Sequence, residues 1–260
     1  MKITNEKEIL LTALARSGNH ALIYWIINQI TNINNGDFFA RGRTEVNENP
    51  MIIPRLIPNP YPKVYRKLLI YNYEDKRIED IFSKYFVKNR KKWVGNSKEV
   101  YNVILLRDPF NHFASRLKIQ SKLKKNKIKR AKKNYKAAIK LWINHAKEFL
   151  GETQYISNDK ICINYNQWFI SEKYRKSICD KMHMEFNDRG KNLVPPHGLG
   201  SSFDGMSYDG KASQMNVLKR YKKFTNNNFY RSTFTKELLY YAFKIYDKKD
   251  FNLKWLTQKK

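Results

Sequence analysis

Residues 9–26 read ILLTALARSGNHALIYWI and contain a predicted strand, a tight turn and the start of a helix. The apolar run of residues 9–14 is typical of a buried strand, and from about His20 the apolar residues recur at helical spacing. Small and polar residues form the turn between them, at residues 15–19. A strand that turns over such a loop into a helix directs backbone N–H groups and the positive end of the helix dipole at one point. The stretch therefore predicts a phosphate-binding loop.

This loop differs from the Walker A motif, G-x-x-x-x-G-K-[ST]. When Gly18 is aligned with the second glycine of that motif, Ala13 replaces the first glycine, Asn19 the lysine and His20 the metal-binding hydroxyl residue. The fixed positive charge comes instead from Arg16, two residues before the glycine. Because no Mg²⁺ ligand is evident either, we expect the loop to bind a phosphate group without supporting metal-assisted γ-phosphoryl transfer. Alone, the pattern is equally that of an ordinary βα turn with an exposed arginine.

A second stretch favours the anion-binding interpretation. Residues 100–106, VYNVILL, are apolar enough for a central strand of a parallel sheet. Arg107 follows directly, and Pro109 suits the first turn of a helix, where its missing N–H costs nothing. Ser115 lies about two helical turns beyond, so its hydroxyl can face the same anion as Arg107. The alternative is an Arg–Asp pair at a helix start, but two strand ends that each deliver an arginine to one sheet edge argue against it.

The length and composition of the chain limit which folds and which binding partners are plausible. The chain of 260 residues can bury one large core, so we expect residues 1–260 to form a single domain. Aromatic residues make up 14% of it, which argues against extensive disorder. The formal net charge of +28 favours anionic partners, such as nucleotides, nucleic acids, acidic glycans or a membrane surface.

The two cysteines, Cys162 and Cys179, form no disulfide framework and fit a reducing compartment. Cys179 and His183 lie four residues apart, but two ligands do not make a metal site, and we predict none. We see no secretory signal and no stretch near the roughly 20 apolar residues of a membrane span. A soluble, cytoplasmic protein is therefore expected.

Strand and helix patterns alternate along the rest of the chain. Strands are predicted at residues 67–73 and 160–165, and helices at 77–90, 118–150, 171–182, 214–224 and 233–246. Residues 32–66 and 190–213 are rich in Gly and Pro and are expected to be loops. The alternation predicts an α/β fold, a three-layer α/β/α sandwich with a central parallel sheet. With the loop at residues 15–19, this is expected to be a P-loop-like nucleotide-binding fold.

The first half of the predicted helix at residues 118–150 is strongly basic. Such a run usually forms a solvated face, and docking of a polyanion is the alternative function. Tyr135 is the only aromatic residue in residues 122–136, so the segment is not a base-stacking platform for nucleic acid.

The two motifs, ALARSGNHALIYW and LLRDPFNHFASRL, together resemble the sulfotransferases that use 3′-phosphoadenosine 5′-phosphosulfate (PAPS). The first resembles the P-K-S-G-T-T-W loop of that family, and the second resembles its R-x-P motif with a serine eight residues after the arginine. A weaker similarity joins INYNQWFISEKYRKSICDKM to the family's Y-E-D-L-x-x-x-P…I-x-x-F stretch.

The resemblance implies a role for each matched residue. Arg16, Ser17, Gly18, Asn19 and His20 would bind the 5′-phosphosulfate, with Arg16 in place of the family's lysine. Arg107 and Ser115 would bind the 3′-phosphate, and Tyr165 would lie beside the adenine. The family's C-terminal phosphate-binding loop is poorly matched, and its nearest candidates are Lys211 and Arg220.

Sulfuryl transfer also needs neutralisation of the leaving phosphate and a base for the acceptor's proton. Arg16 and the loop N–H groups would supply the first. Glu74, at the end of the second predicted strand, is the first candidate for the base, His20 is the second and His112 the third. Their alternative roles are a surface carboxylate, a helix-capping residue and a histidine packed on the sheet. The reaction needs no metal.

The acceptor is not specified by the sequence. A basic helix and aromatic loops suit an acidic or sugar-bearing acceptor, and steroids, phenols, lipids and tyrosine peptides remain open. Two other functions are considered: a P-loop-like small-molecule kinase, which would turn over ATP with Mg²⁺, and a basic nucleic-acid-binding protein, which would bind any duplex with a steep salt dependence. We expect nucleic acid to bind only non-specifically.

Overall fold

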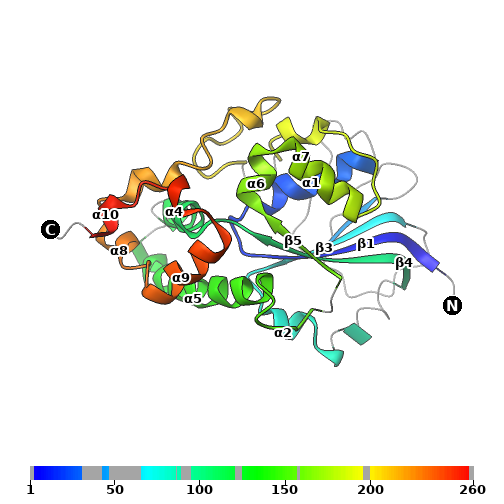
Figure 1. Cartoon of the computed structure of the whole chain (residues 1–260), viewed down its shortest axis with the longest axis horizontal. Coiled ribbons are helices and arrows are strands. Elements are labelled where there is room, and N and C mark those ends of the chain that lie inside the picture. The colour runs from blue at the N-terminus through cyan, green and yellow to red at the C-terminus, as the bar shows by residue number, and fades with distance from the viewer. Residues whose placement is uncertain are drawn as a thin grey trace.

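A five-stranded sheet forms the centre of the protein (Figure 1). The computed structural model describes residues 3–30, 43–46, 66–85, 87–88, 95–120, 125–156, 159–195 and 200–257. Four strands are parallel: β1 (Ile3–Ala13), β3 (Arg66–Glu74), β4 (Asn96–Leu106) and β5 (Lys160–Asn164). The order across the sheet is β2-β3-β1-β4-β5, so the carboxyl ends of β3, β1 and β4 lie side by side. The two predicted arginine-bearing strand ends are therefore neighbours.

The remaining strand adds an antiparallel edge to the predicted parallel sheet. β2 (Arg43–Val46) pairs antiparallel with β3 at the edge of the sheet. It lies inside the segment predicted to be irregular, residues 32–66. Four residues are too few to show a periodic pattern, which explains why the sequence did not reveal this strand.

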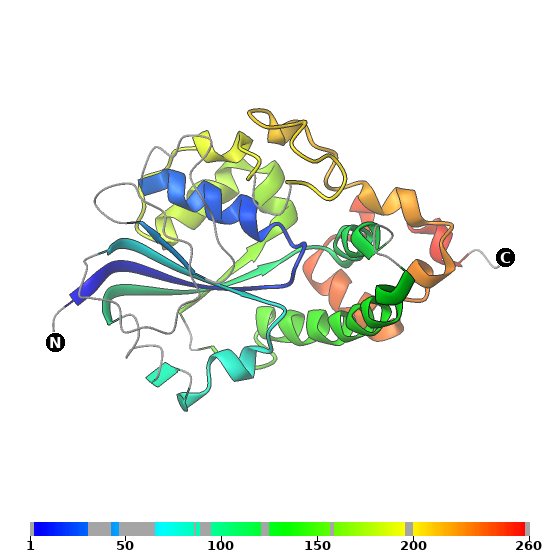
Figure 2. The same ribbon diagram turned by 180° about the vertical axis from the view of Figure 1, so that it is seen from behind.

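Helices cover both faces of the sheet (Figures 1 and 2). One face carries α1 (Asn19–Ile30), α6 (Tyr165–Ile170) and α7 (Glu172–Lys181), and the other carries α2 (Ile78–Ile81) and α5 (Lys125–Phe149). Beyond the carboxyl ends of the strands lie α4 (Pro109–Gln120), α8 (Asn228–Arg231), α9 (Lys236–Ile245) and α10 (Lys254–Thr257). Short 3₁₀ helices complete the chain: η1 (Arg189–Asn192), η2 (Ala212–Gln214), η3 (Arg220–Phe224) and η4 (Lys248–Asp250). The predicted α/β sandwich is confirmed.

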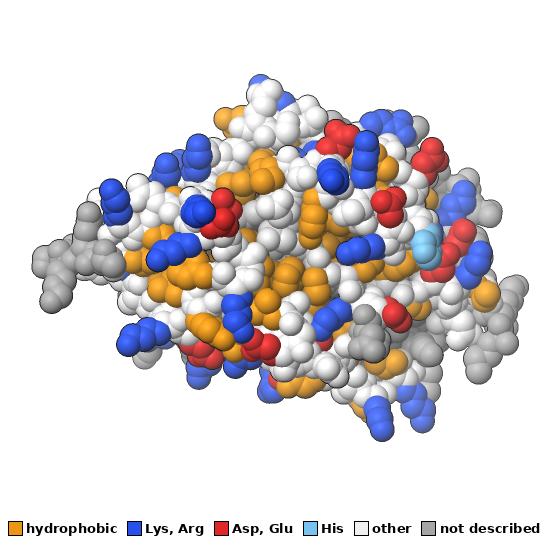
Figure 3. Space-filling model, viewed as in Figure 1, with side chains coloured by type: hydrophobic (Ala, Val, Ile, Leu, Met, Phe, Trp, Pro, Cys, Tyr) orange, Lys and Arg blue, Asp and Glu red, His pale blue; other side chains and the backbone are white. Residues whose placement is uncertain are grey.

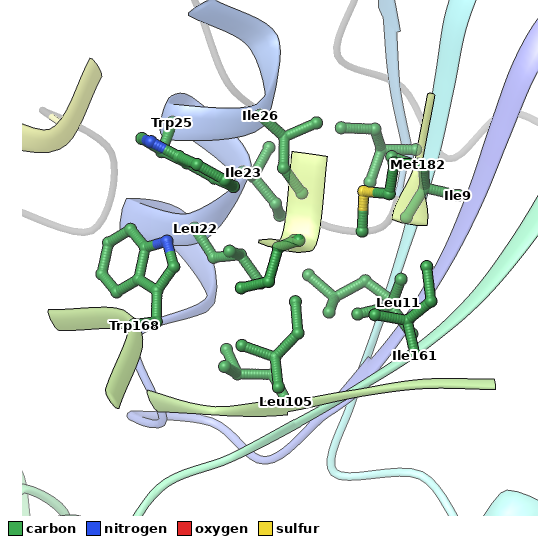
Figure 4. Close-up of a cluster of buried hydrophobic side chains, with 14 of the residues drawn as sticks. Ile9, Leu11, Leu22, Ile23, Trp25, Ile26, Leu105, Ile161, Trp168 and Met182 are labelled. Carbon is green, nitrogen blue, oxygen red and sulfur yellow. The ribbon is translucent and has the colours of Figure 1, made fainter. Parts of the chain in front are cut away.

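The largest core lies between the sheet and α1, α6 and α7. Alternate residues of a strand point to opposite faces, so Ile9 and Leu11 of β1 both reach this core. Figure 4 shows them in one cluster of buried side chains with Leu22 and Ile26 of α1. The burial of this apolar face fixes the direction in which α1 leaves the loop after β1.

A second core joins α4 and α5 to the C-terminal helices. Trp142 of α5 is fully buried in it and donates a hydrogen bond from Nε1 to the backbone oxygen of Arg107, at 2.9 Å. The Tyr230 hydroxyl donates to the backbone oxygen of Phe110, at 2.7 Å. This core therefore holds the start of α4, where the second predicted motif lies.

Several predicted boundaries were wrong. The helix predicted at residues 118–150 is two helices, because α4 continues to Gln120 and α5 begins at Lys125. The crossover helix predicted at residues 77–90 starts with only four helical residues in α2, which ends at Ile81 with Phe82 as its C-cap. Residues 214–224 do not form an α-helix and contain only 3₁₀ turns. Each of these segments is short or highly polar, so its apolar periodicity is weak.

The fourth predicted strand ends one residue early, and this changes the setting of Tyr165. The Asn164 side chain accepts hydrogen bonds from the backbone N–H groups of Asn166 and Gln167, and thereby caps α6. Tyr165 is thus the first residue of a helix that the sequence analysis missed.

The Asp188→Ala variant tests the ion pair that fixes η1 against the helical layer. Asp188 accepts hydrogen bonds from Arg175 Nε at 2.8 Å and from Trp25 Nε1 at 3.0 Å. Because the Arg175 residue is only 6% exposed, removing its partner leaves a buried charge unpaired and should lower the free energy of unfolding by about 3 kcal/mol. Lys176→Ala, which breaks the exposed Lys176–Glu172 pair, should cost less than about 1 kcal/mol. If urea unfolding showed the same loss of stability in Asp188→Ala and Lys176→Ala, the buried ion pair would not have the role described.

Candidate functional site

The loop after β1 has a conformation that only certain residues adopt. Arg16 and Gly18 both have positive φ angles, 75° and 97°, and α1 begins at the next residue, Asn19. A Cβ atom at Gly18 would overlap the ring of Tyr165. The glycine is therefore required both by its backbone conformation and by the close approach of α6.

A cleft with about 800 Å³ of empty space opens at the carboxyl edge of the sheet, next to this loop. The walls come from the loop and α1, from the ends of β3 and β4, from α4 and α6, and from the segment that carries η1, η2 and η3. The last segment, yellow to orange in Figures 1 and 2, runs above the strand ends. Of the predicted site residues, Arg16, Gly18, Asn19, His20, Glu74, Arg107, Ser115 and Tyr165 all line the cleft.

Arg107 and Ser115 lie together as their spacing predicts. Arg107 Nη1 is 3.4 Å from Ser115 Oγ and donates to the backbone oxygen of Arg16, at 3.2 Å. Arg107 Nη2 donates to the backbone oxygen of Val217, and the guanidinium carbon lies 5.0 Å from the centre of the Tyr165 ring. Arg107 is 2% exposed. The second motif is therefore joined directly to the phosphate loop.

Three arginines converge on this end of the cleft. Burial and, to a smaller extent, the nearby charge of Arg107 together lower the pKa of Arg220 to about 10, although Tyr165 and Asp204 act in the opposite direction. The pKa of Arg16 is also lowered, mainly by burial, while Glu74 raises it and Arg107 lowers it. Because the charge of Arg107 lowers the pKa of both Arg16 and Arg220, it repels the charges of these two residues. A bound anion would relieve this repulsion.

Buried polar atoms without a hydrogen-bond partner among the described residues also gather here. They are Asn19 Oδ1, Arg107 Nε, Trp168 Nε1, Lys191 Nζ and Arg220 Nε. Proteins rarely leave such atoms unsatisfied unless a ligand or water completes them. The cleft therefore has the polar atoms of a binding site.

The candidate bases differ in their positions. Glu74 lines the cleft, and its Oε1 accepts a hydrogen bond from Asn19 Nδ2 at 3.0 Å. His20 lines the cleft from the start of α1. His112 is fully buried and is not among the lining residues, so it is not placed to meet an acceptor.

His112 instead supports the loop. The Arg116 Nε–H donates to His112 Nε2 at 2.9 Å, so the proton of the neutral imidazole lies on Nδ1 and points to Ser17 Oγ, 3.2 Å away. Asp75 pairs with Arg116 and accepts from the backbone N–H of Ala15, at 3.0 Å. Ser17 is thus buried under the loop rather than in the cleft. The four-residue spacing of His112 and Arg116, which places them on one helix face, was the sequence signal for this network.

One wall of the cleft is aromatic, and it begins at Tyr165, beside Arg107. Tyr165 lies 5.5 Å from Trp168 and 6.2 Å from Phe169, measured between ring centres. Lys191 lies over Phe169. The sequence analysis did not single out Trp168, Phe169 or Lys191, because α6 was not recognised and η1 has no periodic pattern.

Of the two residues considered for the C-terminal loop, Arg220 lines the cleft and Lys211 is not among the lining residues. Arg220 Nη2 donates to Ser201 Oγ at 2.6 Å and to Asp204 Oδ2 at 2.8 Å. Lys211 is exposed at the start of η2. A binding role for Lys211 stays a prediction that the variants below test.

Within the described ranges, no group of three or more His, Cys, Asp or Glu side chains could hold a metal ion. Cys162 and Cys179 are both free. None of the helices in the described part of the chain is long and apolar enough to cross a membrane.

Two solved structures were compared with this fold. One is titled "Sulfotransferase Domain from the Synechococcus PCC 7002 Olefin Synthase"; it matches with a TM-score of 0.55 and 11% identity over 95% of this chain and 97% of its own. The chain has the fold of a sulfotransferase domain. A second domain, from the curacin biosynthetic pathway, matches with a TM-score of 0.44 and 13% identity, over 92% of this chain and 97% of its own. No protein-family model and no curated protein matches the sequence.

The buried histidines predict a pH-dependent stability. Burial lowers the pKa of His145 to about 4 and that of His112 well below its usual range. Below about pH 6.5 these histidines therefore become protonated in the unfolded chain while they stay neutral in the folded one, and the free energy of unfolding falls. Each histidine should remove about 2 kcal/mol from the free energy of unfolding between pH 7 and pH 5. In urea titrations at pH 7 and pH 5, the free energy of unfolding of His145→Gln should fall by about 2 kcal/mol less than that of the wild type. An identical fall in both proteins would contradict the low pKa of His145.

Proposed function

We propose that the protein is a PAPS-dependent sulfotransferase, with residues 1–260 forming one sulfotransferase-like domain. The observation that carries the proposal is the cleft, in which three arginines converge next to a wall of three aromatic rings. Adenosine 3′,5′-bisphosphate, the product of the donor, has two anionic groups and a flat base, and it matches such a cleft in charge and shape. The fold shared with a sulfotransferase domain supports the same conclusion.

Each motif would take one anionic group. The loop N–H groups and the Arg16 side chain would bind the 5′-phosphosulfate, since they lie at the start of α1. Arg107 and Ser115 would bind the 3′-phosphate, and Arg220 would add a further charge from η3. Tyr165 would face the base.

The transfer step follows from these positions. An acceptor oxygen or nitrogen attacks the sulfur, and the bond between that sulfur and the bridging oxygen of the 5′-phosphate breaks. Negative charge builds on the departing phosphate, where Arg16 and the loop N–H groups stabilise it. The acceptor's proton passes to a base, for which Glu74 is the first candidate because Asn19 holds its carboxylate at the cleft. His20 is the second candidate.

The acceptor stays open. On the face seen in Figure 3, Lys and Arg side chains are scattered among acidic and apolar ones, without forming a continuous basic stripe. The side chains of the basic run at residues 122–133 lie outside the described part of the chain. We keep an acidic or carbohydrate acceptor as the first class to screen.

Calorimetric titration with adenosine 3′,5′-bisphosphate, without magnesium, tests the nucleotide site. The wild type should bind the bisphosphate more tightly than ATP or 5′-AMP. Arg107→Ala, Ser115→Ala and Arg220→Ala should each weaken binding by roughly 10- to 100-fold, because each removes a hydrogen bond to a charged group. Arg189→Ala, an exposed arginine outside the cleft, is the matched control and should bind as the wild type does.

The same titrations separate the alternatives. Weak, salt-sensitive binding of all three nucleotides would contradict the proposal and favour a nucleic-acid-binding protein. Tight binding of ATP only with Mg²⁺ would favour a kinase. Lys211→Ala should leave affinity unchanged, and a loss equal to that of Arg220→Ala would restore Lys211 to the site.

Glu74→Gln tests the catalytic base. It should keep bisphosphate affinity and lower kcat by about 10²- to 10⁴-fold, since the amide cannot take the acceptor's proton. Transfer of radiolabelled sulfonate from PAPS to a panel of glycan, phenol and amine acceptors would provide the assay. If His20→Gln loses kcat while Glu74→Gln does not, His20 is the base.

A further inference from the structure

Among the ionisable side chains of the described cleft residues, Lys191 is the one whose charged group contacts aromatic rings and has no polar partner among the described residues. Its Nζ lies 4.0 Å from the centre of the Phe169 ring and 5.4 Å from that of Trp168. The residue is 6% exposed, and Nζ has no hydrogen-bond partner among the described residues. A buried ammonium without a polar partner is unfavourable, and contact with aromatic rings offsets only part of the cost.

The backbone gives this lysine little freedom to move away. At the preceding residue, Gly190, an added Cβ would lie 2.9 Å from Trp25 Cα and 3.0 Å from the backbone oxygen of Tyr24. Thus η1 packs directly on α1. The ion pair of Arg175 with Asp188 holds the start of η1 as well. A rigid backbone that delivers an unpaired cation to a cleft is a feature of a binding site rather than of a stable core.

Lys191 is electrostatically separate from the arginine cluster. Burial lowers its pKa to about 8, and the charges that act on it are Arg175 and Asp188. By contrast, Arg16 and Arg220 are both influenced by Arg107. Besides the arginines at the phosphate loop, the cleft therefore has a second cationic position, over the rings of Trp168 and Phe169.

The chemistry around Lys191 favours a base over a third phosphate. The neighbouring walls are aromatic or aliphatic, from Trp168, Phe169, Leu193 and Val194. A phosphate dianion bound here would give up its hydrating water and gain contact with only one cation, which is unfavourable. A flat heterocycle would bury apolar surface against the aromatic rings and would still offer a ring nitrogen as a hydrogen-bond acceptor. We propose that Lys191 recognises the nucleotide base by donating a hydrogen bond from Nζ to a ring nitrogen of the adenine. This assignment rests on the proposed function.

Binding of deaza analogues to the wild type and to Lys191→Met provides the test. The probes are adenosine 3′,5′-bisphosphate and its 1-deaza, 3-deaza and 7-deaza forms, each of which replaces one ring nitrogen by carbon. The wild type should lose about tenfold in affinity for one of the three forms. Lys191→Met keeps the length and apolar contact of the side chain. It should bind adenosine 3′,5′-bisphosphate about tenfold more weakly than the wild type does. It should bind the deaza form that the wild type discriminates against no more weakly than it binds adenosine 3′,5′-bisphosphate.

Two further measurements separate recognition from structural support. Lys191→Met should unfold at the same urea concentration as the wild type or a higher one, since the ammonium contributes no polar contact to the fold. Lys173→Met, an exposed lysine on α7, should bind all four probes as the wild type does.

The outcomes distinguish the two proposals. Equal wild-type affinity for all four probes, or a deaza-dependent loss that persists in Lys191→Met, would overturn the role of Lys191 and leave the sulfotransferase proposal intact. Failure of the wild type to bind the parent bisphosphate would overturn the sulfotransferase proposal, and the role of Lys191 with it.

Discussion

The repulsion among Arg16, Arg107 and Arg220 is the constraint on which this site depends. Two of these residues, Arg107 and Arg220, are almost wholly buried, and each carries an Nε atom without a partner among the described residues. Folding has to hold three like charges in one cleft, although the charge of Arg107 disfavours the charges of both Arg16 and Arg220. The arrangement makes physical sense when an anion completes it. The geometry of the surrounding elements can be understood as the means of holding these charges in place.

Each arginine is supported by a different part of the fold. The β1 loop keeps Arg16 in a left-handed conformation, and the buried contacts of His112 and Arg116 support that loop from below. The backbone at Arg107 is fixed by Trp142 from the second core. Arg220 comes from η3 and is held by Ser201 and Asp204. The site thus joins the sheet, both cores and the C-terminal segment, and a change far from the cleft can alter the spacing of its charges.

The parts that could be predicted from the sequence are local. The phosphate loop is one unbroken strand–turn–helix segment. Ser115 lies on α4, eight residues after Arg107 at the end of β4, so their juxtaposition follows from local geometry. The parallel sheet follows from the alternation of apolar strands and helices. These features need no information about distant contacts.

The remaining parts depend on contacts between distant segments. Arg220 and Lys211 were indistinguishable in sequence, because the segment around them has no periodic pattern and only its packing directs one of them into the cleft. Lys191 follows a glycine in a 3₁₀ turn, and nothing in its neighbourhood indicates burial. The polar cap at Asn164 converts the strand end into α6 and brings Tyr165 against Gly18, which no propensity argument could anticipate.

A crystal structure of the protein with adenosine 3′,5′-bisphosphate would test the central claim most directly. The account predicts one phosphate on the β1 loop beside Arg16, the other between Arg107, Ser115 and Arg220, and the base against the aromatic wall with Lys191 beside it. A nucleotide bound elsewhere, or one bound in this cleft with its phosphates away from the arginines, would contradict it.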